Sequence, residues 1–216
     1  GAGPAGSACA QQLARSGFRV LLADQHSFPR DKVCGDGLIP DALTALARLG
    51  VHNEVMRAAR RAMHVGCVGP RGGRIDVPSH LAVLQREVLD DILRRSALRA
   101  GAQWLAPARF EACLLDARQR VFGARLQLED GTLHEVRASW VVLATGAVPA
   151  ALAAAGVCER RTPSGIALRG YVSNPAMIER ITALEVVWHK QLAKGYGWIF
   201  PCREGVFNIG VGLAHS

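Results

Sequence analysis

The sequence has few lysines for a chain of its charge. Its formal net charge is +8 over 216 residues, but only three of its 26 basic residues are lysines (Lys32, Lys190 and Lys194), and the arginines are scattered. Surfaces that bind nucleic acids usually carry clustered basic residues interleaved with aromatic ones. We therefore expect no nucleic-acid partner. The charge is compatible with an anionic cofactor or with peripheral association with an anionic membrane surface.

Cysteine pairs with the spacing of a known motif are also lacking. No two cysteines have the two-residue separation of a metal or thioredoxin motif, and the chain is too large to need a disulfide framework. We expect free thiols in a reducing cytoplasm and no metal site. The six cysteines are Cys9, Cys34, Cys67, Cys113, Cys158 and Cys202.

The sequence contains no long unbroken hydrophobic run. Its longest uncharged segment, Ala138–Cys158, has about the length of a membrane span. Thr145, Gly146 and Pro149 interrupt it, and its aliphatic residues are concentrated at Val141–Leu143. We expect a buried strand, a turn and an alanine-rich helix there.

Both ends of the sequence interrupt a pattern. A glycine-rich phosphate loop follows a strand, but here the loop starts at Gly1. At the other end, Val206–Leu213 alternates like a strand and then stops. We expect the chain to be a fragment of a longer protein.

The first six residues form a complete G-x-G-x-x-G motif. The first glycine permits a tight turn, the second lets a pyrophosphate approach the backbone, and the third lets the following helix pack closely. A helix over Ala5–Arg15 and a strand over Phe18–Ala23 lead to Asp24, whose carboxylate is placed to bind ribose hydroxyls. The pattern predicts an FAD or NAD(H) site, and an acid at this position argues against a 2′-phosphate. The alternative is a glycine turn with an incidental aspartate.

Helices and strands then alternate along the chain. Strand–helix–strand, then helices and antiparallel strands, predict an α/β fold with two layers of different character. The other expected helices are Asp41–Leu49, Asn53–Arg61 and the amphipathic Arg86–Leu98. The other expected strands are Val65–Val68, Arg74–Val77, Gln103–Leu105, Phe110–Leu115, Val121–Leu128, Thr132–Val136, Trp140–Ala144, Ile166–Val172, Leu184–Trp188, Gly197–Phe200 and Val206–Val211. Glu129, Asp130 and Gly131 predict a hairpin between Val121–Leu128 and Thr132–Val136.

The segment 28–38 combines three features in one loop. Its sequence, F-P-R-D-K-V-C-G-D-G-L, has basic residues, a lone cysteine, and two glycines that permit unusual backbone shapes. From composition alone it is a solvated loop in which Cys34 is a buried, inert thiol.

This loop resembles the geranylgeranyl reductase family of flavoproteins, which has the p-hydroxybenzoate hydroxylase-type FAD fold. Residues 195–201 (G-Y-G-W-I-F-P) and 208–212 (N-I-G-V-G) resemble the family's Y-x-W-x-F-P segment and the strand after it. The helix opened by Gln85 and Arg86 resembles the family's arginine helix. Residues 144–149 (A-T-G-A-V-P) depart from the family and resemble a turn of two-dinucleotide flavoproteins. The family's second FAD motif is expected beyond Ser216.

The resemblance implies a set of site residues. Cys34 would lie at the reactive face of the flavin as a catalytic residue. The cofactor contacts would be Gly1, Gly3, Ala5 and Gly6 at the pyrophosphate, Asp24 at the ribose, Cys34, Gly35 and Gly37 along the flavin, Arg86 over the cofactor, the backbone near Phe110 at the adenine, and Gly146. Tyr196, Trp198 and Phe200 would line an apolar cavity for a prenyl chain. From the residues alone, these three aromatics are alternate residues of a strand that fill the core.

The resemblance also implies a domain organisation and an activity. A Rossmann-like FAD-binding domain (1–61 and 81–150) would be interwoven with an antiparallel substrate domain (62–80 and 151–216). The full protein would reduce carbon–carbon double bonds of a prenyl substrate in the cytoplasm or at a membrane surface. NAD(P)H or reduced ferredoxin would supply the electrons. The alternatives are an FAD-dependent monooxygenase or halogenase of the same fold, and a non-catalytic remnant.

Overall fold

The computed structural model describes residues 1–159 and 162–214, and the chain divides into two compact units. The first unit comprises Gly1–Arg30 and Asp90–Thr162, and the second comprises Asp31–Leu89 and Pro163–Ser216. The chain combines helices and strands, as expected for an α/β fold, with runs of consecutive strands in its second half. The compact units put residues 31–61, 81–89 and 151–162 on the other side of the expected domain boundaries. The division into compact units does not show which residues bind the cofactor and which bind the substrate, so the FAD-binding and substrate domains stay a prediction.

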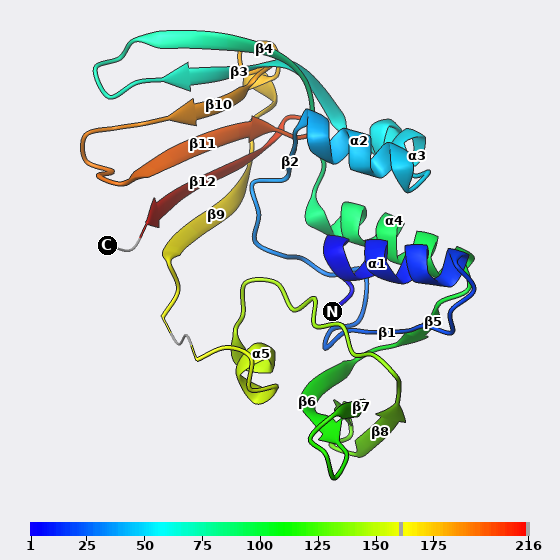
Figure 1. The fold of residues 1–216 in the computed structure, drawn as a ribbon. Coiled ribbons are helices and arrows are strands. Elements are labelled where there is room, and N and C mark those ends of the chain that lie inside the picture. Colours follow the sequence, from blue (N-terminus) through cyan, green and yellow to red (C-terminus); the bar gives the residue numbers. More distant parts are fainter. Residues whose placement is uncertain (160–161, 215–216) are drawn as a thin grey trace. The chain divides into compact units, whose positions relative to one another are not determined.

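The first unit contains a helix pair packed on two short parallel strands (Figure 1). Alanines of the two helices and Leu22 form one buried cluster, because small side chains let helices approach a sheet closely. Pro4 opens the first helix at the position where a missing N–H costs nothing. These elements are α1 (Pro4–Arg15), β1 (Leu21–Ala23), β5 (Gln103–Leu105) and α4 (Arg86–Arg99), which begins in the second unit.

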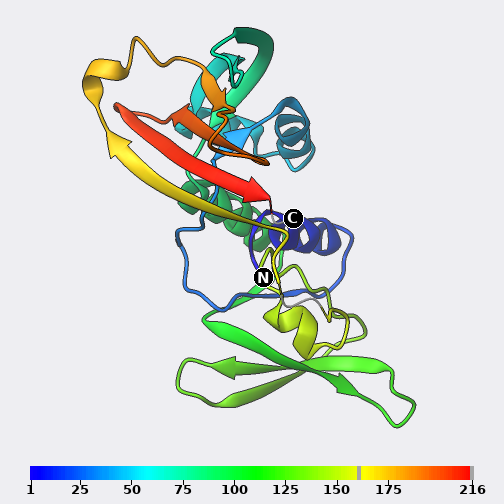
Figure 2. The same ribbon diagram turned by 90° about the vertical axis from the view of Figure 1, so that its left-hand side faces the viewer.

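A three-stranded antiparallel sheet completes the first unit (Figure 2). The predicted hairpin at residues 129–131 is confirmed. Gly131 has a φ of +83°, and the N–H of Leu128 donates to the carbonyl of Thr132 at 2.9 Å. The elements are β6 (Ala108–Leu115), β7 (Val121–Leu128), β8 (Leu133–Arg137) and the short helix α5 (Ala150–Ala154), which packs against β6.

The buried strand predicted at Trp140–Ala144 is wrong. These residues form no strand, and the side chains of Trp140 and Val142 are 87% and 58% exposed. An apolar segment becomes a strand only when a neighbouring strand takes up its backbone hydrogen bonds. In residues 1–159 and 162–214, the parallel sheet of this unit consists of β1 and β5 alone, so no described strand accepts it.

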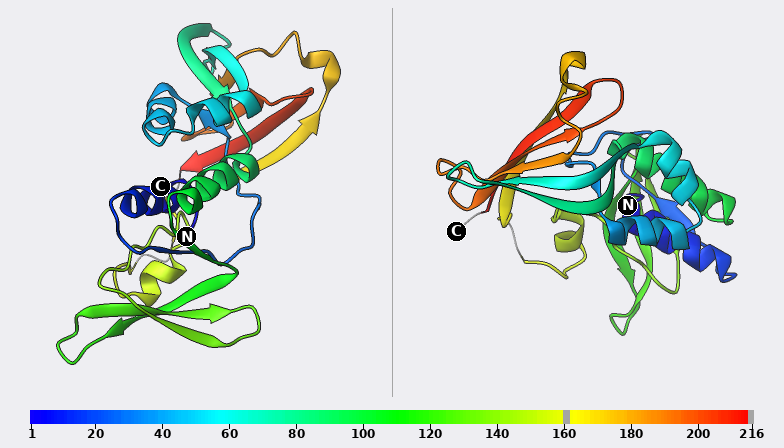
Figure 3. Two further views of the ribbon diagram at one scale, coloured as in Figure 1. Left: turned by 90° about the vertical axis from the view of Figure 1, so that its right-hand side faces the viewer. Right: turned by 90° about the horizontal axis from the view of Figure 1, so that it is seen from above.

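The second unit is built on a seven-stranded twisted sheet, which Figure 3 shows from above. Its strand order is β2-β4-β3-β10-β11-β12-β9. The pairing is antiparallel as predicted, except that β10 runs parallel to β3. The strands are β2 (Gly37–Leu38), β3 (Arg60–Val68), β4 (Arg74–Val83), β9 (Gly165–Ser173), β10 (Leu184–Val187), β11 (Gly195–Pro201) and β12 (Val206–Ala214).

Two helices and one buried cluster accompany this sheet. Helix α2 (Pro40–Arg48) packs beside β4 and against α3 (His52–Ala58), and a 3-10 turn covers Pro175–Met177. Leu81, Val83 and Leu184 form the core of the cluster, and Phe200 packs against it. In the part of the chain that the structure describes, no helix is both long and apolar enough to cross a membrane.

Candidate cofactor and substrate site

The glycine loop of the first unit depends on close backbone approach. A Cβ atom added to Gly6 would overlap the carbonyl oxygen of Gly1, and one added to Gly1 would lie 2.5 Å from the carbonyl oxygen of Ala144. Gly3 caps the 12-residue helix α1 without a side-chain hydrogen bond, and Ala5 lies in its first turn. The first N–H groups of a helix carry partial positive charge. This loop is therefore suited to bind a pyrophosphate.

Asp24 ties the end of β1 to this loop. Its side chain is 6% exposed. One carboxylate oxygen accepts from the N–H of Ala2 at 2.7 Å, and the other accepts from the N–H of His26 at 3.0 Å. Arg30 lies 3.8 Å from Asp24 and 3.1 Å from the buried carboxylate of Asp90. The carboxylate thus lies at the phosphate loop, and its ribose contact stays a prediction.

A buried hydroxyl beside the loop fits a bound dinucleotide. Thr145 Oγ1 is buried and has no hydrogen-bond partner within residues 1–159 and 162–214. Its Cα would lie 3.6 Å from a Cβ atom added to Gly1. Such a buried polar atom costs free energy unless a partner reaches it, which a cofactor phosphate or hydroxyl can do. The residues present therefore fit FAD at this loop. Gly146, the next residue, has a φ of +72°.

Phe110 lies on β6, away from the glycine loop in sequence. It pairs with Leu126 next to a register shift, and it packs against a cluster containing Ala108 and Leu126. Its backbone contact with adenine stays a prediction.

In the second unit, the loop Cys34–Gly37 is held by a buried carboxylate. Asp36 is 2% exposed, and its φ of +64° lies in the left-handed region. Its Oδ2 accepts from the hydroxyl of Tyr171 at 2.6 Å and from the Asn208 amide at 2.7 Å. Its Oδ1 accepts from the N–H of Arg86 at 3.3 Å. Burial raises the pKa of Asp36, and the hydrogen bonds from Tyr171 and Asn208 act in the opposite direction.

Asn208 joins this loop to the sheet. Its buried amide nitrogen also donates to the carbonyl oxygen of Cys34 at 2.8 Å. Its amide oxygen accepts from Trp198 Nε1 at 2.8 Å. Because an indole N–H can only donate, the orientation of the amide is fixed by chemistry.

The aromatic residues of β11 lie at different depths. A Cβ atom on Gly35 would lie 3.3 Å from the Phe200 ring and 3.5 Å from Trp198 Nε1, and one on Gly37 would lie 3.2 Å from Phe200. Trp198 is 7% exposed, whereas Tyr196 is 45% exposed. Trp198 and Phe200 therefore pack against the Cys34–Gly37 loop, and a side chain at position 35 or 37 would require the Phe200 ring to shift by a few tenths of an ångström.

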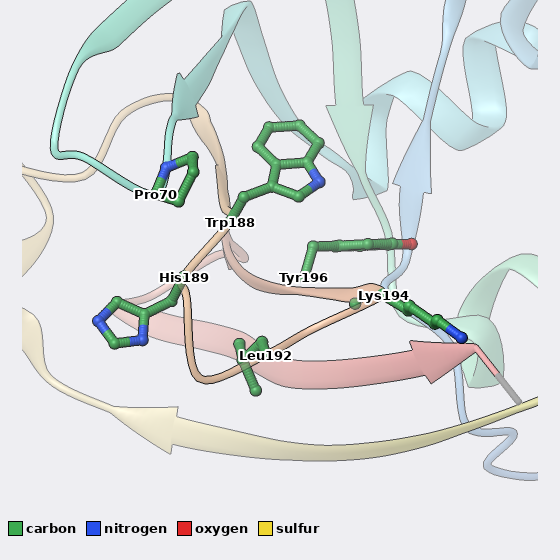
Figure 4. A pocket seen from close by; sticks show the side chains of 7 residues that line it. Pro70, Trp188, His189, Leu192, Lys194 and Tyr196 are labelled. Carbon is green, nitrogen blue, oxygen red and sulfur yellow. The ribbon is translucent and has the colours of Figure 1, made fainter. Parts of the chain in front are cut away.

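Tyr196 borders an open hollow of about 350 Å³ in the second unit. Its ring lies 6.3 Å from that of Trp188 and 6.0 Å from that of Trp198. Figure 4 shows Tyr196 and Trp188 on one side of the hollow and Leu192 and His189 on the other. The lining residues are Pro70, Trp188, His189, Leu192, Lys194, Gly195 and Tyr196. Binding of a prenyl chain by the three aromatics stays a prediction.

Four residues of this arrangement were not predicted from the sequence: Asp36, Arg169, Tyr171 and Asn208. Arg169 donates to Asp31 at 2.6 Å and to the Lys32 carbonyl at 3.2 Å, and its guanidinium lies over the Tyr171 ring. Asp36 and Asn208 lie inside the motifs, but no local spacing connects residues 135 to 174 positions apart. In the described part of the chain, no group of three or more His, Cys, Asp or Glu could hold a metal ion.

Comparison with known proteins identifies the fold. A family of FAD-binding domains matches residues 1–195. A menaquinone reductase of Mycobacterium tuberculosis is 37% identical over 98% of this chain. A digeranylgeranylglycerophospholipid reductase of Methanopyrus kandleri is 31% identical over the whole chain, which confirms the resemblance to geranylgeranyl reductases. The solved flavin-dependent brominase Bmp2 covers 99% of this chain with a TM-score of 0.84 at 23% identity, a likeness that confirms the FAD-binding fold.

The chain spans about half the length of these proteins. It covers 53% of the menaquinone reductase, 54% of the Methanopyrus reductase and 54% of the brominase.

Proposed function

The chain belongs to the FAD-binding domain family, and we propose that the protein containing it is an FAD-dependent oxidoreductase that reduces carbon–carbon double bonds of a prenyl-bearing lipid. The observation that carries this proposal is the alignment of almost the entire chain with two proteins named as reductases. The compounds in both names, a menaquinone and a digeranylgeranyl lipid, carry polyprenyl chains. The brominase supports the fold alone, because its identity to this chain is 23%.

The cofactor would be held mainly by the first unit. Gly1, Gly3 and the first turn of α1 would bind the pyrophosphate, Asp24 would bind the ribose, and Thr145 would supply a hydroxyl. Bound FAD in its reduced state supplies a hydride, which is chemistry that no side chain can perform.

The second unit would position the substrate. Gly35 and Gly37 carry no side chains, so their backbone could lie along the flavin, while Phe200 packs on the side where their Cβ atoms would stand. Arg86, which opens α4 and whose N–H donates to Asp36, would lie over the cofactor. Tyr196, Trp198 and Phe200 would offer apolar walls to a prenyl chain, which presents little else to recognise. Cys34 would lie at the reactive face.

The test uses the full-length protein, reduced with dithionite without oxygen and incubated with a geranylgeranyl lipid. The expected product has gained two hydrogens per double bond reduced, as measured by mass spectrometry. NAD(P)H and reduced ferredoxin then replace dithionite in separate reactions, which identifies the electron donor. An unchanged lipid without oxygen, together with a hydroxylated or halogenated product in its presence, would replace the reductase by the monooxygenase or halogenase alternative.

The role of Cys34 is tested with Cys34→Ser. If the thiol lies at the reactive face, the variant keeps its FAD, but substrate reoxidises its reduced flavin more slowly. The reason is that the side chain at position 34 changes in acidity and polarisability while its volume barely changes. Equal single-turnover rates in the variant and the wild type would show that Cys34 only packs.

A further inference from the structure

The backbone at Asp36 adopts a conformation that an L-residue rarely takes. Its φ of +64° lies in the left-handed region, where aspartate is tolerated better than most residues. The neighbouring glycines, Gly35 and Gly37, pack closely against Trp198 and Phe200. A strained residue between two tightly packed glycines needs contacts that hold it in place, and such conformations are concentrated at functional sites.

The polar contacts of Asp36 form one closed set of donors and acceptors. Its carboxylate receives three donors: the Tyr171 hydroxyl, the Asn208 amide and the N–H of Arg86. Asn208 uses both of its amide hydrogens, on Asp36 and on the Cys34 carbonyl, and its oxygen receives the Trp198 indole. The loop is therefore fixed at residues 34 and 36 by one side chain.

Strand β9, which carries Tyr171, also holds residues 31 and 32, just before the Cys34–Gly37 loop. Arg169 binds Asp31 and the Lys32 carbonyl, two residues along the strand from Tyr171. The face of β9, β11 and β12 that carries Tyr171, Trp198 and Asn208 therefore holds residues 31–36 at several points.

This arrangement costs stability. Burial raises the pKa of Asp36 above its ordinary value, so the ionised carboxylate is less favourable in the folded protein than in the unfolded one. Its contribution to stability is lost as the pH rises from the unfolded pKa through the folded pKa.

We propose that Asp36, Tyr171 and Asn208 are positioning residues that set the conformation of the Cys34–Gly37 loop. They act through the loop and need not touch the substrate. The consequence for turnover rests on the proposed function, whereas the consequence for loop geometry does not.

The test uses the full-length holoprotein and three changes. Asp36→Asn keeps the shape and tolerates the left-handed backbone, but it turns one oxygen into a donor that faces other donors. Tyr171→Phe removes a single hydrogen bond and is the mild variant. Asn208→Asp sets two carboxylates against each other and also removes the donor to the Cys34 carbonyl. Combining it with Asp36→Asn therefore restores the pair between positions 36 and 208 but not the contact to Cys34.

The first readout is the alkylation rate of Cys34, measured by peptide mass mapping. We expect a rise of about tenfold in Asp36→Asn and about threefold in Tyr171→Phe, because the first change disturbs an acceptor that three donors share, whereas the second removes one of these donors. Cys67 on β3 and Cys113 on β6 are internal controls whose rates should not change. In the double variant the rate should fall only part of the way toward that of the wild type, because the Cys34 carbonyl still lacks its donor at position 208.

The second readout is turnover. Asp36→Asn should lower kcat with little change in KM for the lipid and with full FAD occupancy. The proposal is overturned if Cys34 reacts at the wild-type rate in Asp36→Asn, or if Cys67 and Cys113 accelerate together with it. If the wild-type protein reduces no prenyl lipid, the proposed function fails, and the alkylation series still decides the positioning role because it needs only the FAD-bound protein.

Discussion

The glycine loop of the first unit and the Cys34–Gly37 loop of the second are fixed by different kinds of contact. In the first, backbone meets backbone: Gly6 packs on the carbonyl of Gly1, and a single carboxylate, Asp24, reaches back to Ala2. In the second, side chains hold the backbone, and they come from strands more than 130 residues away in sequence.

This difference determines what each loop tolerates. A loop fixed by close backbone approach fails when any side chain is added, even one as small as alanine. A loop fixed by side chains fails when a hydrogen-bond partner changes, even if the shape is kept. The first loop is suited to an anion that needs only N–H groups, and the second to a surface on which individual groups must be positioned.

The largest effect is expected for Gly6→Ala in the first unit. The new methyl group would overlap the carbonyl oxygen of Gly1, which as backbone cannot move aside cheaply. We expect FAD affinity to fall by at least about 100-fold, equivalent to about 2.8 kcal/mol, in a titration of the apoprotein. Gly73→Ala is the control: Gly73 has no positive φ, and an added Cβ meets nothing within 4 Å, so the FAD affinity should not change. If Gly6→Ala keeps its FAD, close backbone approach does not define this loop.

In the second unit the corresponding change is Gly210→Ala. A methyl group there would overlap the Trp198 ring and lie 2.6 Å from the carbonyl oxygen of Leu168. Because Trp198 is buried and bonded to Asn208, we expect a loss of about 2 kcal/mol in the free energy of unfolding from overpacking. Gly170→Ala on β9, where an added Cβ meets nothing, should change it by less than about 0.5 kcal/mol in the same denaturant titration. Equal effects at the two glycines would show that close packing against Trp198 does not make position 210 sensitive to substitution.

The two loops also differ in how far they could be predicted. The glycine fingerprint and Asp24 lie within 24 residues, and each glycine has a local steric reason, so sequence alone placed them correctly on a loop, a helix and a strand end. Asp36 was visible between two glycines, but its partners Tyr171 and Asn208 become neighbours only through strand pairing. Phe200 pairs with Asn208, and Asn208 pairs with Tyr171.

The errors in the predicted fold also come from strand pairing between residues that are far apart in sequence. Hairpins with local turn residues, such as residues 129–131, were predicted correctly because their pairing partner is adjacent in sequence. The parallel pairing of β10 with β3 joins residues about 120 positions apart and carries no local signal. The strand expected at Trp140–Ala144 failed because hydrophobicity alone does not supply a pairing partner.

Asp24→Ala tests the single side chain on which the first loop depends. It leaves the buried N–H of Ala2 without an acceptor and removes the predicted ribose contact. We expect FAD binding to weaken by about 1.5–3 kcal/mol, the usual range for a hydrogen bond to a charged group. Asp24→Asn retains an oxygen for Ala2 and should lose less. Unchanged FAD affinity in Asp24→Ala would show that the carboxylate only closes the end of β1.

The smallest effect is expected for the change in stability with alkaline pH, which depends on Cys202 in the second unit. Burial raises the pKa of the Cys202 thiol in the second unit from 9.0 to about 11, and the nearby carboxylate of Asp36 adds to the shift. Because the folded protein holds this proton more tightly than the unfolded chain, the contribution to stability is complete below pH 9 and is lost as the pH rises to about 11. Linkage then predicts that Cys202 alone lowers the free energy of unfolding by about 1 kcal/mol between pH 8 and pH 10.

Cys202→Ala should remove that part of the pH dependence while keeping the part due to other groups, such as Tyr171, whose pKa is also raised by burial. Denaturant titrations of both proteins at the two pH values measure the difference directly. If the free energy of unfolding falls equally with pH in the variant and the wild type, the thiol ionises as freely in the folded sheet as in the unfolded chain. Burial in the second unit then does not raise its pKa.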